Sequence, residues 1–308
     1  MEKQILALGF FDGVHIGHQA LLKECCRMAK ENNCAAGVVT FDNHPVGVIT
    51  GTFPGLVCTL RDRKTLLHQY GMDQVTVLHF DHLMRSVTYA HFFRTLVEKY
   101  NAAGFVCGED YRFGAQGRGN AQTLQELCRN AGLPCTVVPR QTLDGNAFSS
   151  SLIRSFIETG HMSQAVRYLG HPYLLTGTVV HGHQLGRKLG IPTANLMLPK
   201  ELIVPKFGVY ACMVQVDGKR YPAVTNIGTR PTVAGIGITV EPWILDYEGD
   251  LYGREITLEF YCFLRPEQRF STLEALQQEI RRNAQDAREI LKEVSQATPC
   301  TEGKNVVE

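Results

Sequence analysis

Residues Gly9–His18 read GFFDGVHIGH and join an apolar run, Gln4–Leu8, to a segment whose apolar residues recur at helical spacing. The run is typical of a buried parallel strand, so this stretch lies where a strand ends and a helix begins. Free backbone N–H groups and the positive end of the helix dipole favour an anion there. His15 and His18 can both donate hydrogen bonds to a phosphate as charge builds on it. The stretch therefore predicts a phosphate-binding turn in an α/β domain.

The glycines of this stretch support the same interpretation. Gly9, Gly13 and Gly17 lack the side chains that would keep a phosphate away from the backbone. The alternative is a glycine-rich turn with two incidental histidines. That alternative does not explain why the strand, the glycines, Asp12 and both histidines coincide where nucleotides bind in α/β sheets.

Length and composition restrict the class of protein. A chain of 308 residues predicts about two domains. Lys and Arg number 31 against 30 for Asp and Glu, with no long basic run, so we expect no nucleic-acid partner. No apolar run approaches the ~20 residues that span a bilayer, and no signal peptide is visible. The ten cysteines include adjacent Cys25 and Cys26 but no Cys-x-x-Cys, which favours reduced thiols in a cytoplasmic protein.

Strand and helix patterns alternate in the first half of the chain, which predicts a parallel sheet covered by helices on both faces. The expected strands are Ile5–Leu8, Ala35–Phe41, Val75–Phe80, Phe105–Gly108 and Thr136–Pro139. The expected helices are His18–Asn32, Leu60–Tyr70, Thr88–Tyr100, Ala121–Ala131, Ser150–Glu158 and Ser163–Leu169. Ligands of such a sheet bind at the carboxyl ends of its strands.

The pattern changes from Tyr173 onward, where strands follow one another without helices and predict an antiparallel sheet or small closed barrel. These strands are Leu174–Val180, Gly208–Val216, Lys219–Ile227, Ile238–Tyr247 and Glu255–Phe263, and a last helix is expected over Thr272–Val294. Asp217-Gly218 predicts a two-residue hairpin turn. We expect one domain over residues 1–160, a linker over 161–172, a second domain over 173–295 and a flexible tail over 296–308.

Three further stretches suit a nucleotide site in the first domain. His44 follows the second strand, although a strand ended by Pro45 would explain that position equally well. After the fourth strand, GEDYRFG at Gly108–Gly114 offers glycine for close approach, Arg112 for phosphate and aromatic rings for stacking. SSSLIR at Ser149–Arg154 begins a helix; capping explains one serine but not the arginine on the same helix face.

A second dense motif, HGHQLGRKLGIPTAN, occupies His181–Asn195. It lacks the Walker spacing, and its histidine pair has no third metal ligand in view. Its glycines and basic residues nevertheless suit phosphates, the hydroxyl of Thr193 suits Mg²⁺, and the amide of Asn195 suits metal or phosphate oxygen. The alternative, a polar hairpin connection, explains the glycines better than the Pro-Thr-Ala-Asn that follows.

These motifs resemble two enzyme families. GFFDGVHIGH resembles the His-x-Gly-His signature of nucleotidyltransferases in its flavin adenylyltransferase branch, and SSSLIR resembles their Ser-Ser-Thr-x-x-Arg motif, with Ser151 in place of Thr. TFDNHP at residues 40–45 resembles their Phe-x-Pro-His-Pro, with Asn43 in place of the first proline. The second motif resembles the riboflavin kinase signature Gly-x-x-x-Gly-Arg-x-Leu-Gly-x-Pro-Thr-Ala-Asn. Together, over residues 4–292, they resemble the bifunctional riboflavin kinase/FAD synthetase family.

The resemblance implies a Rossmann-like nucleotidyltransferase domain followed by a kinase barrel, with riboflavin, FMN, FAD and ATP as substrates and products and Mg²⁺ as cofactor. The catalytic residues would be Glu241, as base of the kinase, and His15, His18 and Arg154. In the first domain, binding would involve Gly9, Phe11, Asp12, Gly13, Gly17, His44, Asp110, Arg112, Phe113, Ser150 and Ser151. In the second it would involve Gly182, Gly186, Arg187, Gly190, Pro192, Thr193, Asn195 and Trp243, with Thr193 and Asn195 at the metal.

Around these residues the sequence departs from the family pattern. Pro242-Trp243 stands where a small residue and His are common, and Asn283 where the last helix often has Asp. The alternative function is a nucleotidyltransferase for another phosphate substrate, joined to a non-catalytic flavin-binding barrel. A homo-oligomer or weak self-association stays open.

Overall fold

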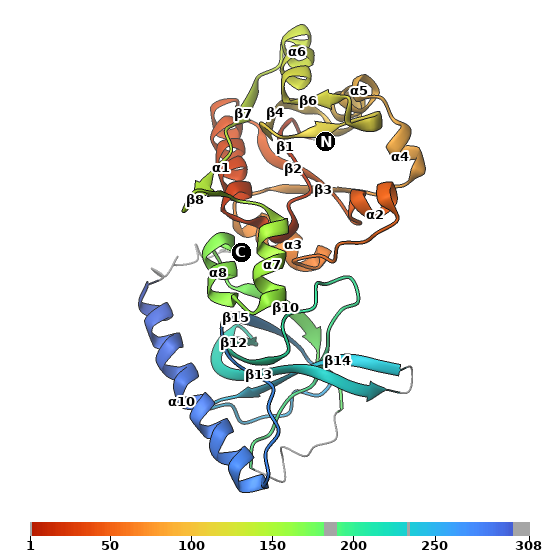
Figure 1. Ribbon diagram of the computed structural model, residues 1–308. Helices are drawn as coiled ribbons and strands as arrows, with labels where there is room; N and C mark the ends of the chain where they lie inside the picture. Colours follow the sequence, from red (N-terminus) through yellow and green to blue (C-terminus); the bar gives the residue numbers. More distant parts are fainter. Residues whose placement is uncertain (1, 182–189, 233–234, 298–308) are drawn as a thin grey trace. The chain divides into compact units, whose positions relative to one another are not determined.

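The computed structural model describes residues 2–181, 190–232 and 235–297. Its contacts divide the chain into two compact units (Figure 1). Unit 1 comprises Met1–Ser155, Arg167–His171 and Lys200–Ile203, and unit 2 comprises Phe156–Val166, Pro172–Pro199 and Val204–Glu308. The chain thus passes between the units more than once. The domain bounds expected from the sequence stay a prediction.

Unit 1 is built on a five-stranded parallel sheet with the order β3-β2-β1-β4-β7. The strands are β1 (Gln4–Leu8), β2 (Ala35–Phe41), β3 (Gln74–Leu78), β4 (Ala102–Gly108) and β7 (Cys135–Val138). The order reverses at β1, so the carboxyl ends of β1 and β4 form the crevice where ligands of such sheets bind. The predicted parallel α/β domain is confirmed.

Helices cover both faces of this sheet, because each strand is buried and needs apolar cover. Those that pack on its strands are α1 (Ile16–Glu31), α3 (Leu60–Gln69), α5 (Tyr89–Tyr100) and α6 (Ala121–Ala131). The chain also forms α2 (Pro45–Thr50), α4 (His82–Ser86), α7 (Ser150–Thr159) and α8 (Met162–Leu169), and Phe156–Val166 of the last two belongs to unit 2. Phe93 and Leu96 of α5 and Leu124 of α6 share one core cluster with Leu6 and Phe105 of the sheet. α1 packs along β1, β2 and β4 (Figure 1).

Several short elements of unit 1 were not expected from the sequence. They are α2, α4, the 3₁₀ turns η1 (Asp12–Val14) and η2 (Ala115–Gly117), and the hairpins β5 (Arg112–Phe113) with β6 (Gly119–Asn120) and β8 (Thr142–Leu143) with β9 (Asn146–Ala147). Elements of two to six residues carry too little periodicity to be recognised in a sequence.

Unit 2 contains a six-stranded sheet with the order β10-β15-β12-β13-β14-β11. Its strands are β10 (Tyr173–Thr178), β11 (Leu196–Met197), β12 (Gly208–Val216), β13 (Lys219–Thr232), β14 (Gly235–Ile244) and β15 (Glu255–Pro266). Every pairing is antiparallel. The two end strands of the order contact each other, so the sheet nearly closes into the predicted barrel.

Two local features explain how the barrel turns and closes. Gly177 of β10 packs against Leu196 of β11, since a Cβ at position 177 would lie 2.9 Å from a methyl of Leu196. Asp217 and Gly218 both have positive φ, 49° and 75°, as a type I′ hairpin requires, which confirms the predicted turn between β12 and β13.

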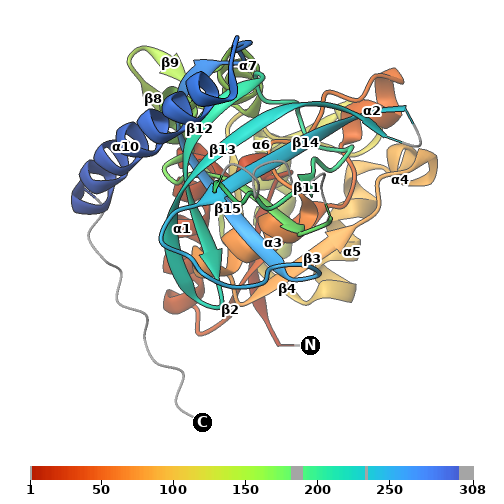
Figure 2. The same ribbon diagram turned by 90° about the horizontal axis from the view of Figure 1, so that it is seen from below.

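The last helix, α10 (Leu273–Ala297), lies across the barrel strands (Figure 2). Its Ala284, Ala287 and Leu291 pack with Val209 and Ala211 of β12 in one buried cluster. Small alanines let the helix backbone approach the strands closely. The helix therefore supplies one side of the core of unit 2 rather than a separate layer.

Candidate functional sites

A cleft of about 680 Å³ opens at the carboxyl end of the unit 1 sheet. Nearly all residues predicted for the first site line it: Gly9, Phe11, Asp12, His15, Gly17, His18, His44, Asp110, Arg112, Phe113, Ser150, Ser151 and Arg154. They come from the turns after β1, β2 and β4 and from the start of α7. The structure thus brings four separate stretches of sequence to one surface.

Gly13 is the exception, because it does not line the cleft. Its φ is +74°, and a Cβ there would lie 2.7 Å from the Val57 side chain, so glycine is required by the backbone and by packing beneath the turn. Its N–H donates to Cys58 Sγ at 3.2 Å. The structure therefore gives a structural reason for glycine at this position, and a role of Gly13 at a phosphate stays a prediction.

Two residues of the turn after β1 have unusual backbone angles. Phe11 has φ of 56° and Val14 has φ of 40°, which side-chain-bearing residues rarely adopt and a β-branched valine least of all. Both are completely buried. Surrounding contacts hold this strained turn, a condition found most often at functional sites.

The two signature histidines stack on each other, with ring centroids 3.6 Å apart. His15 caps α1, since its Nδ1 accepts the His18 N–H at 3.2 Å. This leaves the proton of the neutral ring on Nε2. Gly17 permits this ring position, because a Cβ there would lie 3.2 Å from the His15 ring. The glycine therefore serves the histidine as well as the cleft.

Burial keeps both imidazoles neutral near pH 7. It lowers the pKa of His15 from 6.5 to about 4. The pKa of His18 also lies well below its ordinary value, through burial and then through the charges of His15 and Arg63. His18 Nδ1 is buried without a hydrogen-bond partner among the described residues. In the protein alone the histidines are therefore neutral hydrogen-bond donors rather than cations.

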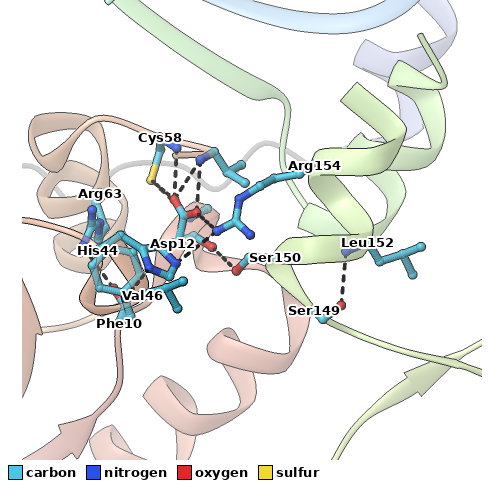
Figure 3. Close-up of polar contacts among 12 residues, drawn as sticks. Phe10, Asp12, His44, Val46, Cys58, Arg63, Ser149, Ser150, Leu152 and Arg154 are labelled. Carbon is cyan, nitrogen blue, oxygen red and sulfur yellow. Dashed lines mark hydrogen bonds and ion pairs between the residues drawn. The ribbon is translucent and has the colours of Figure 1, made fainter. Parts of the chain in front are cut away.

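Asp12 and Arg154 form a buried ion pair at the floor of the cleft (Figure 3). Arg154 NH2 donates to Asp12 Oδ2 at 2.8 Å. The Asp12 carboxylate also accepts from the backbone N–H groups of Val57 at 2.9 Å and Cys58 at 3.3 Å. Ser150 Oγ donates to the Asp12 carbonyl at 2.9 Å, which ties the start of α7 to the turn after β1.

His44 caps α2 much as His15 caps α1. Its Nδ1 accepts the Val46 N–H at 3.1 Å, and its Nε2 lies 3.4 Å from Arg154 NH2. Burial, followed by the charge of Arg154, lowers the pKa of His44. Asn43 fixes this turn, because its amide donates to the Phe80 carbonyl at 2.8 Å and accepts the Phe80 N–H at 2.9 Å. Nothing in the sequence alone indicated that Asn43 joins the ends of β2 and β3.

The far wall of the cleft follows β4. Phe113 is buried and stacks on Tyr111, with centroids 5.4 Å apart, while Arg112 is exposed. Asp110 and Arg112 both line the cleft. An aromatic wall with a cation at its edge can accommodate a planar ring that carries a phosphate.

Arg63 is a functional candidate that the sequence reasoning missed. Its side chain is completely buried, and its NH1 donates to the Phe10 carbonyl, the Thr40 hydroxyl and the Phe41 carbonyl. Its Nε and NH2 have no hydrogen-bond partner among the described residues, and its guanidinium lies 4.2 Å from the centre of the Phe10 ring. The signal was present, since Arg63 shares a helix face with buried Leu66 and Leu67. A cation on an apolar helix face is rarely buried without a purpose.

The described residues of unit 2 line two cavities on its barrel. The first, about 310 Å³, is lined by Glu241 and Trp243 of β14, by Thr193 and by Asn283 of α10. The second, about 430 Å³, is lined by Pro192 and again by Thr193. Thr193 is thus shared by both cavities.

The remaining residues of the second motif are placed only in part. The Asn195 side chain is buried, and Gly190 has φ of 68°. Gly182, Gly186 and Arg187 lie outside the described residues. Asn283, where the family pattern has Asp, accepts from Arg265 Nε at 2.9 Å and donates to Glu279 at 3.2 Å.

The donor set suits a metal that arrives with a nucleotide. Among the described residues, no three His, Cys, Asp or Glu side chains gather as a metal site. A threonine hydroxyl and an asparagine amide are oxygen ligands of the kind Mg²⁺ accepts when phosphates and water supply the others. Thr193 lines both cavities and fits such a role, whereas Asn195 lines neither of them, and its part at a metal stays a prediction.

Among the described helices, none is long and apolar enough to cross a bilayer. The nine cysteines within the described part of the chain are all free thiols.

Comparisons with known proteins agree with this division. A family model described as FAD synthetase matches residues 1–152, and one described as riboflavin kinase matches residues 169–291. A solved structure described as a macrolide-efflux protein from Streptococcus pneumoniae superimposes with a TM-score of 0.85 at 28% identity, covering 93% of this chain and 94% of that one.

Three curated relatives carry the name bifunctional riboflavin kinase/FMN adenylyltransferase. The one from Pseudomonas fluorescens is 39% identical over 287 residues, 92% of each chain. The one from Escherichia coli K12 is 37% identical, covering 94% of this chain and 93% of the relative. The one from Bacillus subtilis is 33% identical, covering 92% of each. This chain belongs to the family of bifunctional riboflavin kinase/FMN adenylyltransferases.

Proposed function

We propose that the two reactions of this family run at two separate sites, one in each unit. In unit 2, riboflavin and ATP give FMN and ADP; in unit 1, FMN and ATP give FAD and pyrophosphate. The observation that carries the proposal is the presence of two distinct sets of cavities, each lined by its own phosphate-binding motif.

In unit 1, a phosphate oxygen of FMN attacks the α-phosphorus of ATP, and the bond to the bridging oxygen of pyrophosphate breaks. The attacking phosphate is already an anion, so no strong base is needed. His15 and His18 donate hydrogen bonds to the phosphate where charge develops, and Arg154 contacts the departing pyrophosphate. Gly9 and Gly17 allow the backbone to approach, while Ser150 and Ser151 lie beside Arg154.

The aromatic wall of unit 1 holds the flavin in this proposal. Phe113 lies near the ring, and Arg112 and Asp110 contact the nucleotide. The support is that these three residues, which follow β4, line the same cleft as His15 and His18, although they are far from the histidines in the sequence.

In unit 2, Glu241 takes the proton from the primary hydroxyl of riboflavin as this oxygen attacks the γ-phosphorus of ATP. Its position in one cavity with Trp243 supports flavin binding there. Pro192 in the adjoining cavity supports nucleotide binding on that side. Thr193, shared by the two, would hold Mg²⁺ with Asn195 where the transferred phosphate passes.

A divalent metal is a general requirement of such enzymes; that it is Mg²⁺ belongs to this proposal. The metal would neutralise charge on the ATP phosphates at both sites. The domain bounds of 1–160 and 173–295, a cytoplasmic location, and self-association of the chain are likewise proposed rather than established.

The test separates the two activities by mutation. Glu241→Gln should abolish FMN formation from riboflavin and leave FAD formation from added FMN nearly intact. His18→Ala should do the reverse, so that FMN accumulates. A mixture of the two variants should restore conversion of riboflavin to FAD through free FMN. Flavin chromatography measures the products in each case. If Glu241→Gln also abolished FAD formation from FMN, the two-site proposal would fail.

A further inference from the structure

A short segment from the second half of the chain, Lys200–Ile203, belongs to unit 1. We call it the strap. It follows β11 by only three residues in the sequence and lies inside the stretch matched by the riboflavin kinase model. Its neighbours in the sequence belong to unit 2, so its place in unit 1 needs a physical reason.

The strap pairs with the segment before α3 as an isolated parallel bridge, Leu56 with Leu202. Leu56 N–H donates to the Glu201 carbonyl at 2.7 Å, and Ile203 N–H donates to the Leu56 carbonyl at 2.9 Å. Both backbone groups of Leu56 are thus satisfied by the strap. Leu56, Leu202 and Ile203 are all buried, so the bridge is shielded from competing water.

The residues next to Leu56 hold the centre of the adenylylation site. Val57 and Cys58 donate their backbone N–H groups to the Asp12 carboxylate, which pairs with Arg154. The direction of these N–H groups depends on how the backbone at Leu56 lies. The Leu56 carbonyl, which accepts the Ile203 N–H, lies in the same planar peptide unit as the Val57 N–H.

We propose that the strap is a positioning element of the adenylylation site: it fixes Leu56 so that the Val57 and Cys58 N–H groups orient Asp12, which in turn orients Arg154. This inference rests on the proposed role of Arg154 in adenylylation. It also means that the complete first site includes four residues that lie after the kinase motif in the sequence.

Gly55 gives a sharp way to disturb the strap without touching the cleft. Its φ is +71°, and a Cβ there would lie 3.2 Å from Ile203 Cα and 3.3 Å from Ile203 N. Gly51 is a matched control in the same connection, because its φ is +76° but a Cβ there would meet nothing within 4 Å. Alanine at either position has the same backbone strain, and only Gly55→Ala pushes on the strap backbone.

The experiment measures both activities of the full-length chain for Gly55→Ala and Gly51→Ala. We expect Gly55→Ala to lower kcat of FMN adenylylation by about tenfold relative to Gly51→Ala, with little change in KM for FMN, because a misplaced catalytic group lowers kcat first. Riboflavin phosphorylation should be unchanged in both. Equal kcat values for the two variants would overturn the proposal.

An Arg154→Ala background distinguishes positioning from general loosening. Since the strap acts through Asp12 and Arg154, Gly55→Ala should cause little further loss of kcat there. A second full tenfold loss would overturn the proposal. If Gly55→Ala does not fold, Leu202→Ala replaces it, with volume-conserving Leu202→Met expected to restore kcat.

Arg154→Ala alone tests the underlying function separately. If that variant adenylylates FMN normally, the proposed function of Arg154 fails. If it loses adenylylation while Gly55→Ala matches Gly51→Ala, only the strap proposal fails.

Discussion

Replacing Arg154 by alanine should have two consequences that can be separated. Arg154 pairs with Asp12, whose side chain is only 1% exposed, so its loss leaves a buried carboxylate without its cation. Breaking a buried ion pair from one side costs about 3–5 kcal/mol. The Val57 and Cys58 N–H groups still solvate the carboxylate, which places the expected loss near the lower end, about 3 kcal/mol.

The same substitution removes the proposed contact to the departing pyrophosphate. Losing one charge-assisted contact to developing charge lowers the rate by about 10²-fold or more. The stability loss should appear as a fall of roughly 6–12 °C in the Tm of unit 1, at about 2–4 °C per kcal/mol for a domain of this size. Thermal unfolding and FMN adenylylation are measured on the same preparations, with riboflavin phosphorylation as the internal control for unit 2.

The variant Arg154→Ala with Asp12→Asn decides between the two roles. Asparagine removes the uncompensated charge, so most of the lost stability should return. Adenylylation should stay low, because no cation faces the pyrophosphate. Recovery of both stability and activity would refute the reasoning, since Arg154 would then serve only to neutralise Asp12.

Three other outcomes follow from the structure. The folded pKa of His15 lies near 4 and its unfolded value near 6.5, so the unfolded chain binds more protons between these values and stability is lost as pH falls from 6.5 towards 4. His15→Asn can still cap α1 but does not titrate. The change in the free energy of unfolding between pH 6.5 and 4 should therefore be smaller by roughly 3 kcal/mol in this variant, as measured by urea unfolding at several pH values. Riboflavin with Mg²⁺-ADP should quench the fluorescence of Trp243, the only tryptophan, and Trp243→Phe should abolish this fluorescence change. If the fluorescence stays unchanged, the strand that carries Trp243 does not belong to the flavin pocket. Asn43→Ala should free Phe80 and lower adenylylation about tenfold, an effect that should disappear in a His44→Ala background because Asn43 acts through that turn.

Local signals in the sequence were enough to predict most elements of the two folds, but not β11, which has only two residues. Ala35–Phe41 and Gly208–Val216 match their predicted strands residue for residue, since apolar runs bounded by turn residues leave little freedom. Asp217-Gly218 predicted its hairpin because only a few residue pairs adopt two positive φ values in succession.

Strand ends were predicted less well where the limit is set by a distant partner. β14 was expected over Ile238–Tyr247 but ends at Ile244, shortly before Asp246 takes a φ of 61°. β13 was expected to end at Ile227 but continues to Thr232, because its residues 223–232 pair with β14. Pairing of this kind is a tertiary property that local composition does not contain.

The site was predicted as a set of side chains, whereas much of its geometry is made by backbone groups. Asp12 was expected at the cleft, but its donors at positions 57 and 58 were not. They are backbone N–H groups, which stay in place whatever side chains Val57 and Cys58 are replaced by. The strap has no motif at all, because its hydrogen bonds are also made by the backbone. Motifs record where a particular side chain is needed, so contacts of this kind are invisible in a single sequence.

The protonation of the two capping histidines bears on how the adenylylation site manages charge. His15 and His44 each accept a backbone N–H through Nδ1, at the starts of α1 and α2. A neutral imidazole with an acceptor at Nδ1 carries its proton on Nε2, so the His15 ring is a hydrogen-bond donor without net charge. His44 Nε2 instead lies 3.4 Å from Arg154 NH2, which can only donate. Positive charge at the cleft must then come from arginines, since Arg112, Arg140 and Arg154 all line it, together with the carboxylates of Asp12 and Asp110.

This arrangement suits a reaction in which two anions must meet. Neutral donors do not bind a phosphate so tightly in the ground state that it cannot react, yet their hydrogen bonds strengthen as charge builds on the phosphate in the transition state. The anionic substrate would itself favour protonation of the histidines, which opposes the burial that lowers the pKa of His15. Under the proposed function, the histidines would therefore gain positive charge only when ATP and FMN bind in the cleft.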